Sequence, residues 1–241
     1  MGNNFWKRIY DKLREFYYKH HISFWDKNYN YFNHCSRILD IGCGLGRFLS
    51  FFPKKSVGID INIDSIEECR RKGFQAIKGE ATKLPFENET FDGIRCSHII
   101  EHFLPQEAYK VLKEAARVLK PEGILIIQSP LPSPQFYDEI THIRPYPPNA
   151  ILSVYLRPPV IQQSFERMPY RFELVKLEWR YASLFYPVFI EPAYKPSKFK
   201  MALFLKILSL ILYKMKIRSW KKNGYTLVLR KLAVSKSRGN E

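Results

Sequence analysis

The 241-residue chain lacks the marks of several protein classes. Its four cysteines are Cys35, Cys43, Cys69 and Cys96, and no two of them stand in a C-x-x-C spacing. Neither a cysteine zinc site nor a disulfide framework is therefore predicted. The first residues also lack the short apolar core of a signal peptide, which favours the reducing cytoplasm as the setting.

The histidine pattern gives no metal site either. His20, His21 and His34 lie in the N-terminal part of the chain, but no carboxylate or thiol group accompanies them at ligand spacing. The sequence alone therefore predicts that the protein holds no metal.

Positive charge is concentrated in the C-terminal part. The net charge is +16, and residues 195–241 contribute 13 Lys and Arg against one acid. The remaining 194 residues have a net charge of only +4. A polycationic segment requires an anionic partner, which is either a membrane surface or a nucleic acid.

Residues 201–213 (MALFLKILSLILY) form a mainly apolar run of 13 residues within this basic part. A membrane-spanning helix needs about 20 apolar residues, so the run is too short to cross a bilayer. Lysines flank it on both sides, which favours a helix that lies in the membrane interface and reaches anionic headgroups. A buried helix packed on the rest of the fold is the alternative.

The rest of the chain is organised around residues 37–48, which read RILDIGCGLGRF. The apolar residues predict a short buried strand, which Asp40 interrupts. Three alternating glycines follow, and this spacing allows a sharp turn and the close approach of a ligand to the backbone. A helix is predicted over 45–52, and its free N–H groups would favour a carboxylate or phosphate. A nucleotide-like ligand is therefore expected here.

The glycine pattern departs from the dinucleotide fingerprint G-x-G-x-x-G. Arg47 stands where that fingerprint has its third glycine, and its side chain would crowd the contact between helix and strand. Asp60 follows the next predicted strand, 18 positions after Gly42, which is the offset at which an acid meets ribose hydroxyls. The pattern favours a ligand that contains a ribose and is not a dinucleotide.

Strands and helices alternate from residue 37 onward. Strands are predicted over 37–41, 56–61, 75–79, 91–96 and 123–128, with helices over 45–52, 64–72 and 105–119. Asp64 and Glu67 are expected to form the capping box of the second helix, which stops at Gly73. The alternation predicts an α/β fold with a doubly wound parallel sheet and ligands at the carboxyl ends of its strands. The strand-like segments 171–179 and 224–232 come last.

Five segments follow one another over residues 37–130: LDIGCGLGRF, VGIDIN, GEATKLPF, FDGIRCSHIIEHF and EAARVLKPEGILIIQSP. Jointly they resemble the class I S-adenosylmethionine-dependent methyltransferases of the small-molecule type. The resemblance implies a Rossmann-like methyltransferase fold, with a seven-stranded, mostly parallel sheet whose last strand is antiparallel. It also implies S-adenosyl-L-methionine as the cofactor. The cofactor-binding residues that it implies are Asp40, Gly42, Cys43, Gly44, Gly46, Asp60, Ile61, Glu80, Ala81 and Ser97.

The candidate catalytic residues are His102, His142 and Arg144. Residues 97–103 (SHIIEHF) are expected to line the methyl-donor end of the pocket. Within them Glu101 and His102 match a family pattern, although a structural role for His102 at a helix start stays open. Residues 137–146 hold a D-x-x-T-H-x-R arrangement that resembles one in methyltransferases of glycan and quinone pathways. His142 is expected to take a proton from a substrate hydroxyl, and Arg144 to clamp a carboxylate or phosphate. A loop whose residues only satisfy one another is the alternative.

The expected organisation is an N-terminal helical cap over 1–34, a methyltransferase domain over 35–232 and a flexible tail over 233–241. The domain is interrupted by an active-site crossover (133–165) and a basic amphipathic insertion (195–222). Within the cap, apolar spacing predicts a helix over 4–20. That helix packs over the ligand site, faces a membrane, or is an ordinary capping helix.

The expected function is methyl transfer to a small-molecule, glycan or lipid-linked acceptor, through an oxygen atom, by a cytoplasmic protein at the inner membrane surface. A methyltransferase acting on RNA, DNA or protein is a second hypothesis. Against it, the CSHI sequence after the fourth strand differs from the NPPY-type tetrad of nucleic-acid amino-methyltransferases, and no Pro-Cys nucleophile pair stands there. The third hypothesis is a membrane-associated protein that binds the cofactor without turnover. The sequence leaves the oligomeric state open.

Overall fold

The computed structural model describes residues 25–156, 168–181, 208, 212 and 221–233. The chain divides into two compact units, which are residues 32–180 with 223–241 and residues 1–31 with 181–222. The first unit carries the sheet and the candidate site. The helix predicted over 4–20 and most of the basic insertion lie outside the described residues.

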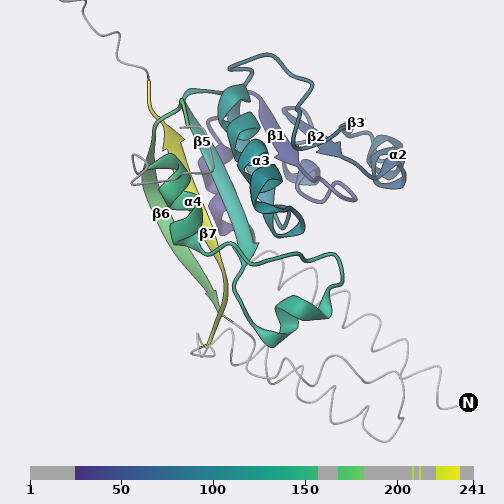
Figure 1. Ribbon diagram of the computed structural model, residues 1–241. Helices are drawn as coiled ribbons and strands as arrows, with labels where there is room; N and C mark the ends of the chain where they lie inside the picture. The colour runs from purple at the N-terminus through teal and green to yellow at the C-terminus, as the bar shows by residue number, and fades with distance from the viewer. Residues whose placement is uncertain (1–24, 157–167, 182–207, 209–211, 213–220, 234–241) are drawn as a thin grey trace, which may run out of the picture. The chain divides into compact units, whose positions relative to one another are not determined.

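A seven-stranded sheet forms the centre of the first unit (Figure 1). Its strands are β1 (Ile38–Ile41), β2 (Ser56–Asp60), β3 (Gln75–Lys78), β4 (Phe91–Ser97), β5 (Leu119–Pro130), β6 (Phe172–Tyr181) and β7 (Lys222–Lys231). They lie in the order β3-β2-β1-β4-β5-β7-β6. The pairs from β3 through β5 are parallel, and β7 runs antiparallel to β5. The predicted α/β fold with an antiparallel last strand is therefore confirmed.

Helices cover the sheet because their apolar residues recur at helical spacing. In α3 (Pro105–Val118) the buried residues include Ala108, Val111, Leu112 and Ala115. In Figure 1, α3 and α4 (Pro148–Tyr155) both lie in front of the sheet. The hydroxyl of Tyr155 donates to the carbonyl oxygen of Leu112 at 2.8 Å and so ties α4 to α3. The remaining helix, α2 (Ile63–Arg71), packs beside β2 and β3.

The helix predicted over 45–52 is wrong. Turns and the short 3-10 helix η2 (Leu49–Phe51) take its place. Gly46 has a φ of +77°, which no right-handed helix accommodates, and Pro53 disfavours helical backbone in the residue before it. The interval between these two positions is too short for a stable α-helix, so the helix N-terminus expected to bind an anion does not form there.

The cap of α2 also differs from the prediction. Asn62, and not Asp64, is the N-cap, since its side-chain oxygen accepts the backbone N–H groups of Asp64 at 2.9 Å and Ser65 at 3.4 Å. The Asp60 carboxylate in turn accepts the N–H of Asn62 at 2.9 Å. The helix start is therefore fixed by the residue that ends β2.

The sheet order places two loops at the point where its winding reverses. From β1 the chain passes to β2 and β3 on one side, whereas β4 and β5 lie on the other side of β1. Ligands of doubly wound sheets bind at such a point, beyond the carboxyl ends of the strands. The loops after β1 and β4 are also in contact there, since a Cβ placed on Gly42 would overlap the side chain of Ile99. The fold thus brings the glycine loop next to the segment that begins at His98.

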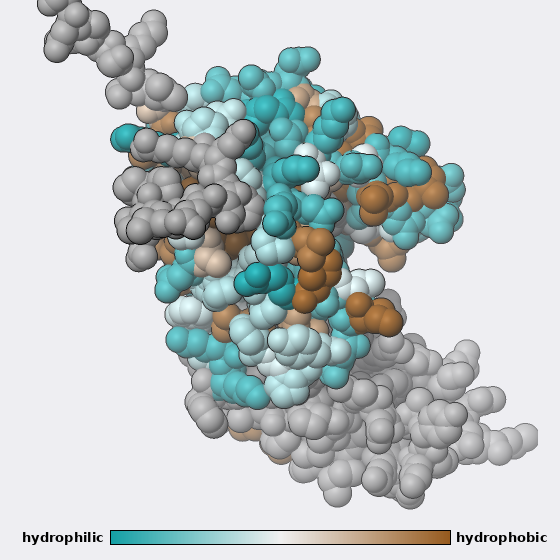
Figure 2. All heavy atoms as spheres, in the orientation of Figure 1, coloured by the Kyte–Doolittle hydropathy of each residue, from teal (hydrophilic) through white to brown (hydrophobic). Residues whose placement is uncertain are grey.

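Apolar side chains gather at a few points of the face shown in Figure 2, among polar ones. Several large apolar residues of the loops are exposed, among them Leu104, Tyr137, Ile140 and Ile143. Among the helices that the structure describes, none combines the length and the apolar composition needed to cross a membrane.

Candidate functional site

The glycine loop leaves β1 and turns back onto β2. The N–H groups of Gly42 and Cys43 both donate to the carbonyl oxygen of Ile59, at 2.7 and 3.1 Å. Gly42, Gly44 and Gly46 all have positive φ, which only glycine adopts without strain. The predicted sharp turn is therefore present.

The three glycines have different surroundings. A Cβ on Gly46 would lie 2.7 Å from the sulfur of Cys69, and one on Gly42 would overlap Ile99, so both positions are closely packed against the protein. A Cβ on Gly44 would have no atom within 4 Å. The open side of the loop is therefore at Gly44, and a ligand can lie against the backbone there.

Asp60 joins the glycine loop to the end of β2. One carboxylate oxygen accepts the N–H of Gly44 at 2.9 Å and the other accepts the N–H of Asn62 at 2.9 Å. Each ionised carboxylate oxygen can accept a further hydrogen bond, so Asp60 can bind a hydroxyl without releasing the loop. The acidic residue predicted at this position thus stands beside the open face of the loop.

Asp40 is fully buried beneath the loop. One of its oxygens pairs with the Nη1 of Arg95 at 2.7 Å, whereas the other, Oδ2, has no hydrogen-bond partner among the described residues. Burial raises the pKa of Asp40 from 3.8 to about 6, against the opposing effect of Arg95. A buried carboxylate oxygen without a partner is costly and suits a site that receives a cation.

Three further predicted cofactor residues follow the carboxyl ends of β2 and β3. Ile61 follows Asp60 and is 69% exposed, and Leu45 in the glycine loop is 61% exposed. Glu80 and Ala81 follow β3, and Glu80 is exposed. The N–H of Gly79 donates to the carbonyl oxygen of Asp60 at 3.0 Å, which holds the ends of β2 and β3 together. An acid and two apolar side chains are thus available around the loop.

Two of the predicted residues are engaged in the sheet. The Cys43 side chain is buried and packs against Gly58, since a Cβ on Gly58 would lie only 2.6 Å from the Cys43 sulfur. Only the backbone of Cys43 can therefore face a ligand. The Ser97 hydroxyl donates to the side-chain oxygen of Gln128 at 3.0 Å, and the Gln128 amide donates to Thr226 at 3.1 Å. The structure therefore gives Ser97 a role in joining β4 to β5, and cofactor contact stays a prediction.

The second half of the site is built around Glu101 in η3 (Ile100–His102), which is fully buried. Its carboxylate accepts hydrogen bonds from His98 at 3.1 Å and from the Ser129 hydroxyl at 3.2 Å. Its backbone carbonyl accepts the N–H groups of Ile143 at 2.9 Å and Arg144 at 3.4 Å. Burial alone would raise the pKa of Glu101, but hydrogen bonding, above all from His98, outweighs it and the pKa is lowered. Glu101 is therefore a buried carboxylate that holds three segments together.

His98 connects Glu101 to β6, the strand at one edge of the sheet. Its Nδ1 faces the carboxylate, and its Nε2 lies 2.8 Å from the Nη1 of Arg180 in β6. Since Arg180 can only donate, Nδ1 of His98 carries the proton. His98 has a φ of +56°, an uncommon conformation for a residue other than glycine, and such strain tends to occur at functional sites. Burial lowers the pKa of Arg180 to about 10.

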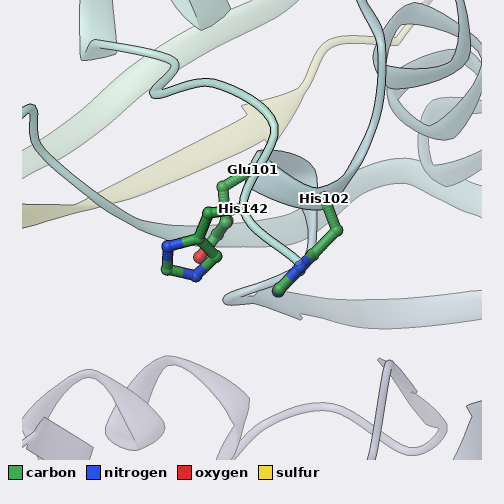
Figure 3. Close-up of side chains that lie close together, drawn as sticks. All are labelled: Glu101, His102 and His142. Atoms are coloured by element: carbon green, nitrogen blue, oxygen red, sulfur yellow. The ribbon is translucent and has the colours of Figure 1, made fainter. Parts of the chain in front are cut away.

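His102 and His142 lie beside Glu101, as Figure 3 shows. Their ring centroids are 4.9 Å apart, although the two histidines are 40 positions apart in the sequence. Nδ1 of His102 lies 3.0 Å from the carbonyl oxygen of Thr141, and Nδ1 of His142 lies 2.7 Å from that of Phe136. A carbonyl oxygen only accepts, so both Nδ1 atoms carry protons, and in the neutral imidazole the lone pair is then on Nε2. The structure therefore brings together two of the three predicted catalytic residues.

Arg144 occupies a different position. Its guanidinium lies over the ring of Tyr146, 5.2 Å from the centroid, and the residue is exposed. The Tyr146 hydroxyl donates to the carbonyl oxygen of Phe103 at 3.0 Å, which anchors this part of the loop. The predicted role of Arg144 as a clamp for an anion stays a prediction.

Sequence reasoning placed Glu101 and His98 in the segment expected to line the methyl-donor end of the site, but it gave no specific role to these two residues or to Arg180 and Ser129. The S-H-x-x-E-H spacing was a usable signal for the first two, because residues three apart in a tight turn lie on the same side. Arg180 is separated from His98 by 82 positions and could not be linked to it without the strand order.

Comparison with known proteins identifies the part of the chain that forms this site. Residues 39–127 match a family model described as a methyltransferase domain. They form a class I S-adenosylmethionine-dependent methyltransferase domain. A solved structure with this fold, a SAM-dependent methyltransferase from Archaeoglobus fulgidus, has a TM-score of 0.61 at 23% identity, covering 90% of this chain and 99% of that one.

The names of curated relatives of the methyltransferase domain state different substrates. A phthiotriol/phenolphthiotriol dimycocerosates methyltransferase from Mycobacterium ulcerans is 34% identical over 109 residues, 40% of this chain and 38% of that protein. A fatty-acid O-methyltransferase from Mycolicibacterium smegmatis is 34% identical over 102 residues, 37% of this chain and 35% of that protein. A probable human tRNA methyltransferase 9B is 39% identical over 94 residues, 38% of this chain and 21% of that protein. The chain thus spans less than half the length of each of them.

S-adenosylmethionine is the cofactor of this class of domain, and the site has features that fit it. The open space at Gly44 admits a ligand to the backbone, and Asp60 stands beside it with acceptor capacity for a hydroxyl. The unpartnered oxygen of Asp40 is an anionic group under the same loop, and S-adenosylmethionine carries cationic sulfonium and ammonium groups. The residues present thus fit the cofactor on shape and on charge.

The raised pKa of Asp40 predicts a pH dependence of stability. Between about pH 4 and pH 6 the folded state binds more protons at Asp40 than the unfolded state, so this residue contributes less stability as pH rises through that range. We expect Asp40→Asn to abolish that contribution, changing the difference in unfolding free energy between pH 5 and pH 7 by about 1 kcal/mol. Urea unfolding of the chain without cofactor at both pH values measures it, with Asp138→Asn in an exposed loop as the control. An unchanged difference in Asp40→Asn would contradict the assignment.

Proposed function

We propose that the chain is an S-adenosylmethionine-dependent methyltransferase that methylates a hydroxyl oxygen. The observation that carries this proposal is the glycine loop, whose open side at Gly44 is hydrogen-bonded to the Asp60 carboxylate. When bound, the cofactor supplies a methyl group that is already activated on a sulfonium. The protein's task is therefore to place the acceptor and remove its proton, and placement alone can supply about 7–11 kcal/mol of the barrier.

The residues around the loop would hold the nucleoside. Asp60 can accept the ribose hydroxyls, and Glu80, at the end of the neighbouring strand, can accept the adenine amino group. The exposed apolar side chains of Leu45 and Ile61 can cover the faces of the base. Asp40 provides negative charge beneath the methionine end of the cofactor.

The imidazole pair His102 and His142 is the part of the site suited to the acceptor. Both rings are oriented by backbone carbonyls through Nδ1, so the lone pair of the neutral imidazole is on Nε2 in both. A hydroxyl must lose its proton as it is methylated, and imidazole groups are the usual means of removing it near neutral pH. The neighbourhood of this pair is where we place the acceptor oxygen.

We place the acceptor in the lipid-linked, glycan-linked or small-molecule class. Two of the relatives carry names of lipid methyltransferases, and one of these names specifies an oxygen atom. Four large apolar residues are exposed in the segments that hold the histidine pair: Leu104, Tyr137, Ile140 and Ile143. Exposed apolar groups beside a polar site suit an acceptor with an apolar chain. A tRNA acceptor is the alternative, on the name of the human relative.

The cytoplasmic face of a membrane is the location that we propose. The support is the sequence of the basic segment, in which lysines flank the apolar run 201–213. Such a composition favours binding to anionic headgroups, with about 1 kcal/mol contributed by each basic residue near the surface.

Replacing Asp60 by alanine is expected to weaken binding of S-adenosylmethionine by on the order of 10- to 100-fold, because a charge-assisted hydrogen bond and the anchor of the loop are lost. Isothermal titration calorimetry measures the dissociation constant. Asp64→Ala, in the exposed first turn of α2, is the matched control and should bind as the unchanged protein does. Equal affinity in the two variants would refute the ribose assignment.

Replacing His142 by alanine is expected to lower methyl transfer by about 100- to 10,000-fold while the affinity for the cofactor changes little. Transfer is followed with cofactor labelled in its methyl group, added to a lysate separated into lipid, glycan, protein and nucleic-acid fractions. His34→Ala, at an exposed position away from the site, should keep the activity. Label in the RNA fraction would replace the proposed acceptor class, and full activity of His142→Ala would remove the histidine from the mechanism.

Flotation with vesicles tests the proposed location. The unchanged protein should float with vesicles that contain anionic lipid, and a variant with glutamate at Lys214, Lys216, Lys221 and Lys222 should not, because the charge attraction is reversed. Neutral vesicles are the lipid control. Equal flotation of the variant, or no flotation of the unchanged protein, would exclude an electrostatic membrane contact through this segment.

A further inference from the structure

Glu101, His102 and His142 form a group whose side chains are of the kinds that bind transition metals. One carboxylate oxygen and one ring nitrogen from each histidine all lie within 4.8 Å of one another. Figure 3 shows the three side chains gathered in one place, with His142 coming from a different segment from the other two. Among the residues that the structure describes, no other three His, Cys, Asp or Glu side chains meet this criterion.

The surroundings of the group are those of a prepared metal site. Metal-bound histidines commonly donate their other N–H to a carbonyl or carboxylate, which fixes the ring and its tautomer. Here Thr141 and Phe136 supply those carbonyl oxygens, so each ring keeps a lone pair on Nε2. The carboxylate is fixed in the same way by His98 and Ser129. All three candidate ligands are thus held by partners outside the group.

The backbone fixes the two segments relative to each other. Ile143 and Arg144 donate their N–H groups to the carbonyl oxygen of Glu101, so the loop that carries His142 is bound to the turn that carries Glu101 and His102. Three ligands in a tetrahedral zinc site lie about 3.3 Å apart, because each is about 2.0–2.1 Å from the ion. The ligand atoms of the present group lie within 4.8 Å of one another, so they would have to approach by up to about 1.5 Å to bind such an ion.

We propose that Glu101, His102 and His142 bind one divalent transition-metal ion, of the zinc or iron(II) class. Two imidazoles and one carboxylate are a common ligand set for these ions, and hard ions such as Mg²⁺ favour all-oxygen sites instead. Three protein ligands leave coordination positions open. An oxygen of the acceptor is the group that such positions would face. A metal-bound Nε2 cannot take a proton, so with the ion present the ion, and not His142, would promote loss of the acceptor proton. The statements about the acceptor alone rest on the proposed function.

Cobalt(II) is the probe, because it replaces zinc and reports its ligands through visible absorption. The full chain is freed of metal with a chelator, titrated with Co²⁺, and analysed for bound metal after gel filtration. We expect one ion per chain and an absorption typical of four- or five-coordination. The double variant His102→Ala/His142→Ala should lose at least about 100-fold in Co²⁺ affinity, because loss of outer-shell groups alone costs 10- to 100-fold.

The chain offers a matched control in the adjacent histidines His20 and His21. The variant His20→Ala/His21→Ala should bind Co²⁺ as the unchanged protein does. If that variant loses the ion and the His102/His142 variant keeps it, or if no variant differs from the unchanged protein, the proposed site is wrong. Glu101→Gln keeps the hydrogen-bonding capacity of the side chain and should lose the absorption band while its circular dichroism is unchanged. Should that variant not fold, the two histidine variants still decide the question.

Calorimetry with S-adenosylmethionine separates this inference from the proposed function. Metal binding without cofactor binding would uphold the site and refute the methyltransferase proposal. Cofactor binding and methyl transfer at an unchanged rate by protein shown to be free of metal would refute a part for the ion in acceptor chemistry.

Discussion

The candidate site depends on a buried charge. Glu101 has no exposed surface, and an ionised carboxylate in such a place is stable only if its oxygens are hydrogen-bonded. His98 at the end of β4 and Ser129 in β5 meet this need, and the main chain of the same residue binds the loop that carries His142. Any movement of these segments would leave the charge without partners, which costs several kcal/mol. The acceptor half of the site is therefore held by an electrostatic requirement, and not by apolar packing alone.

The two halves of the site use different parts of the chain. The proposed cofactor half is made mainly of backbone, since the loop from Gly42 to Gly46 leaves open space at Gly44, whose N–H donates to Asp60. The proposed acceptor half is made of polar side chains from the segment after β4, from β6 and from the crossover loop. Ile99 packs against Gly42 where the two halves meet, so the glycine has no room for a side chain. In the function that we propose, this contact between two loops at the switch point of the sheet would bring the methyl donor and its acceptor together.

Local errors of the sequence-based prediction have physical reasons. The helix over 45–52 was inferred from composition, but the left-handed conformation of Gly46 prevents it, and conformation cannot be read from the residue type alone. Asp64 was predicted as the N-cap because aspartate is common there. In the structure Asn62 is the N-cap: its N–H donates to Asp60, and its side chain accepts the N–H of Asp64. In both cases the backbone conformation and the hydrogen bonds of neighbouring residues decided the outcome.

The antiparallel last strand was implied by the family resemblance. The sequence by itself determined the alternation of strands and helices from residue 56 to 130 and the sharp turn at the glycines. These features depend on residues that are close in the chain, where apolar periodicity and glycine spacing act directly. Only the tertiary structure decided that His102 and His142 face each other, that Glu101 is buried between them and Ser129, and that Arg180 reaches His98. Those contacts join segments that are far apart in the chain, and the order in which the strands lie in the sheet is a property of the whole fold that no local pattern specifies.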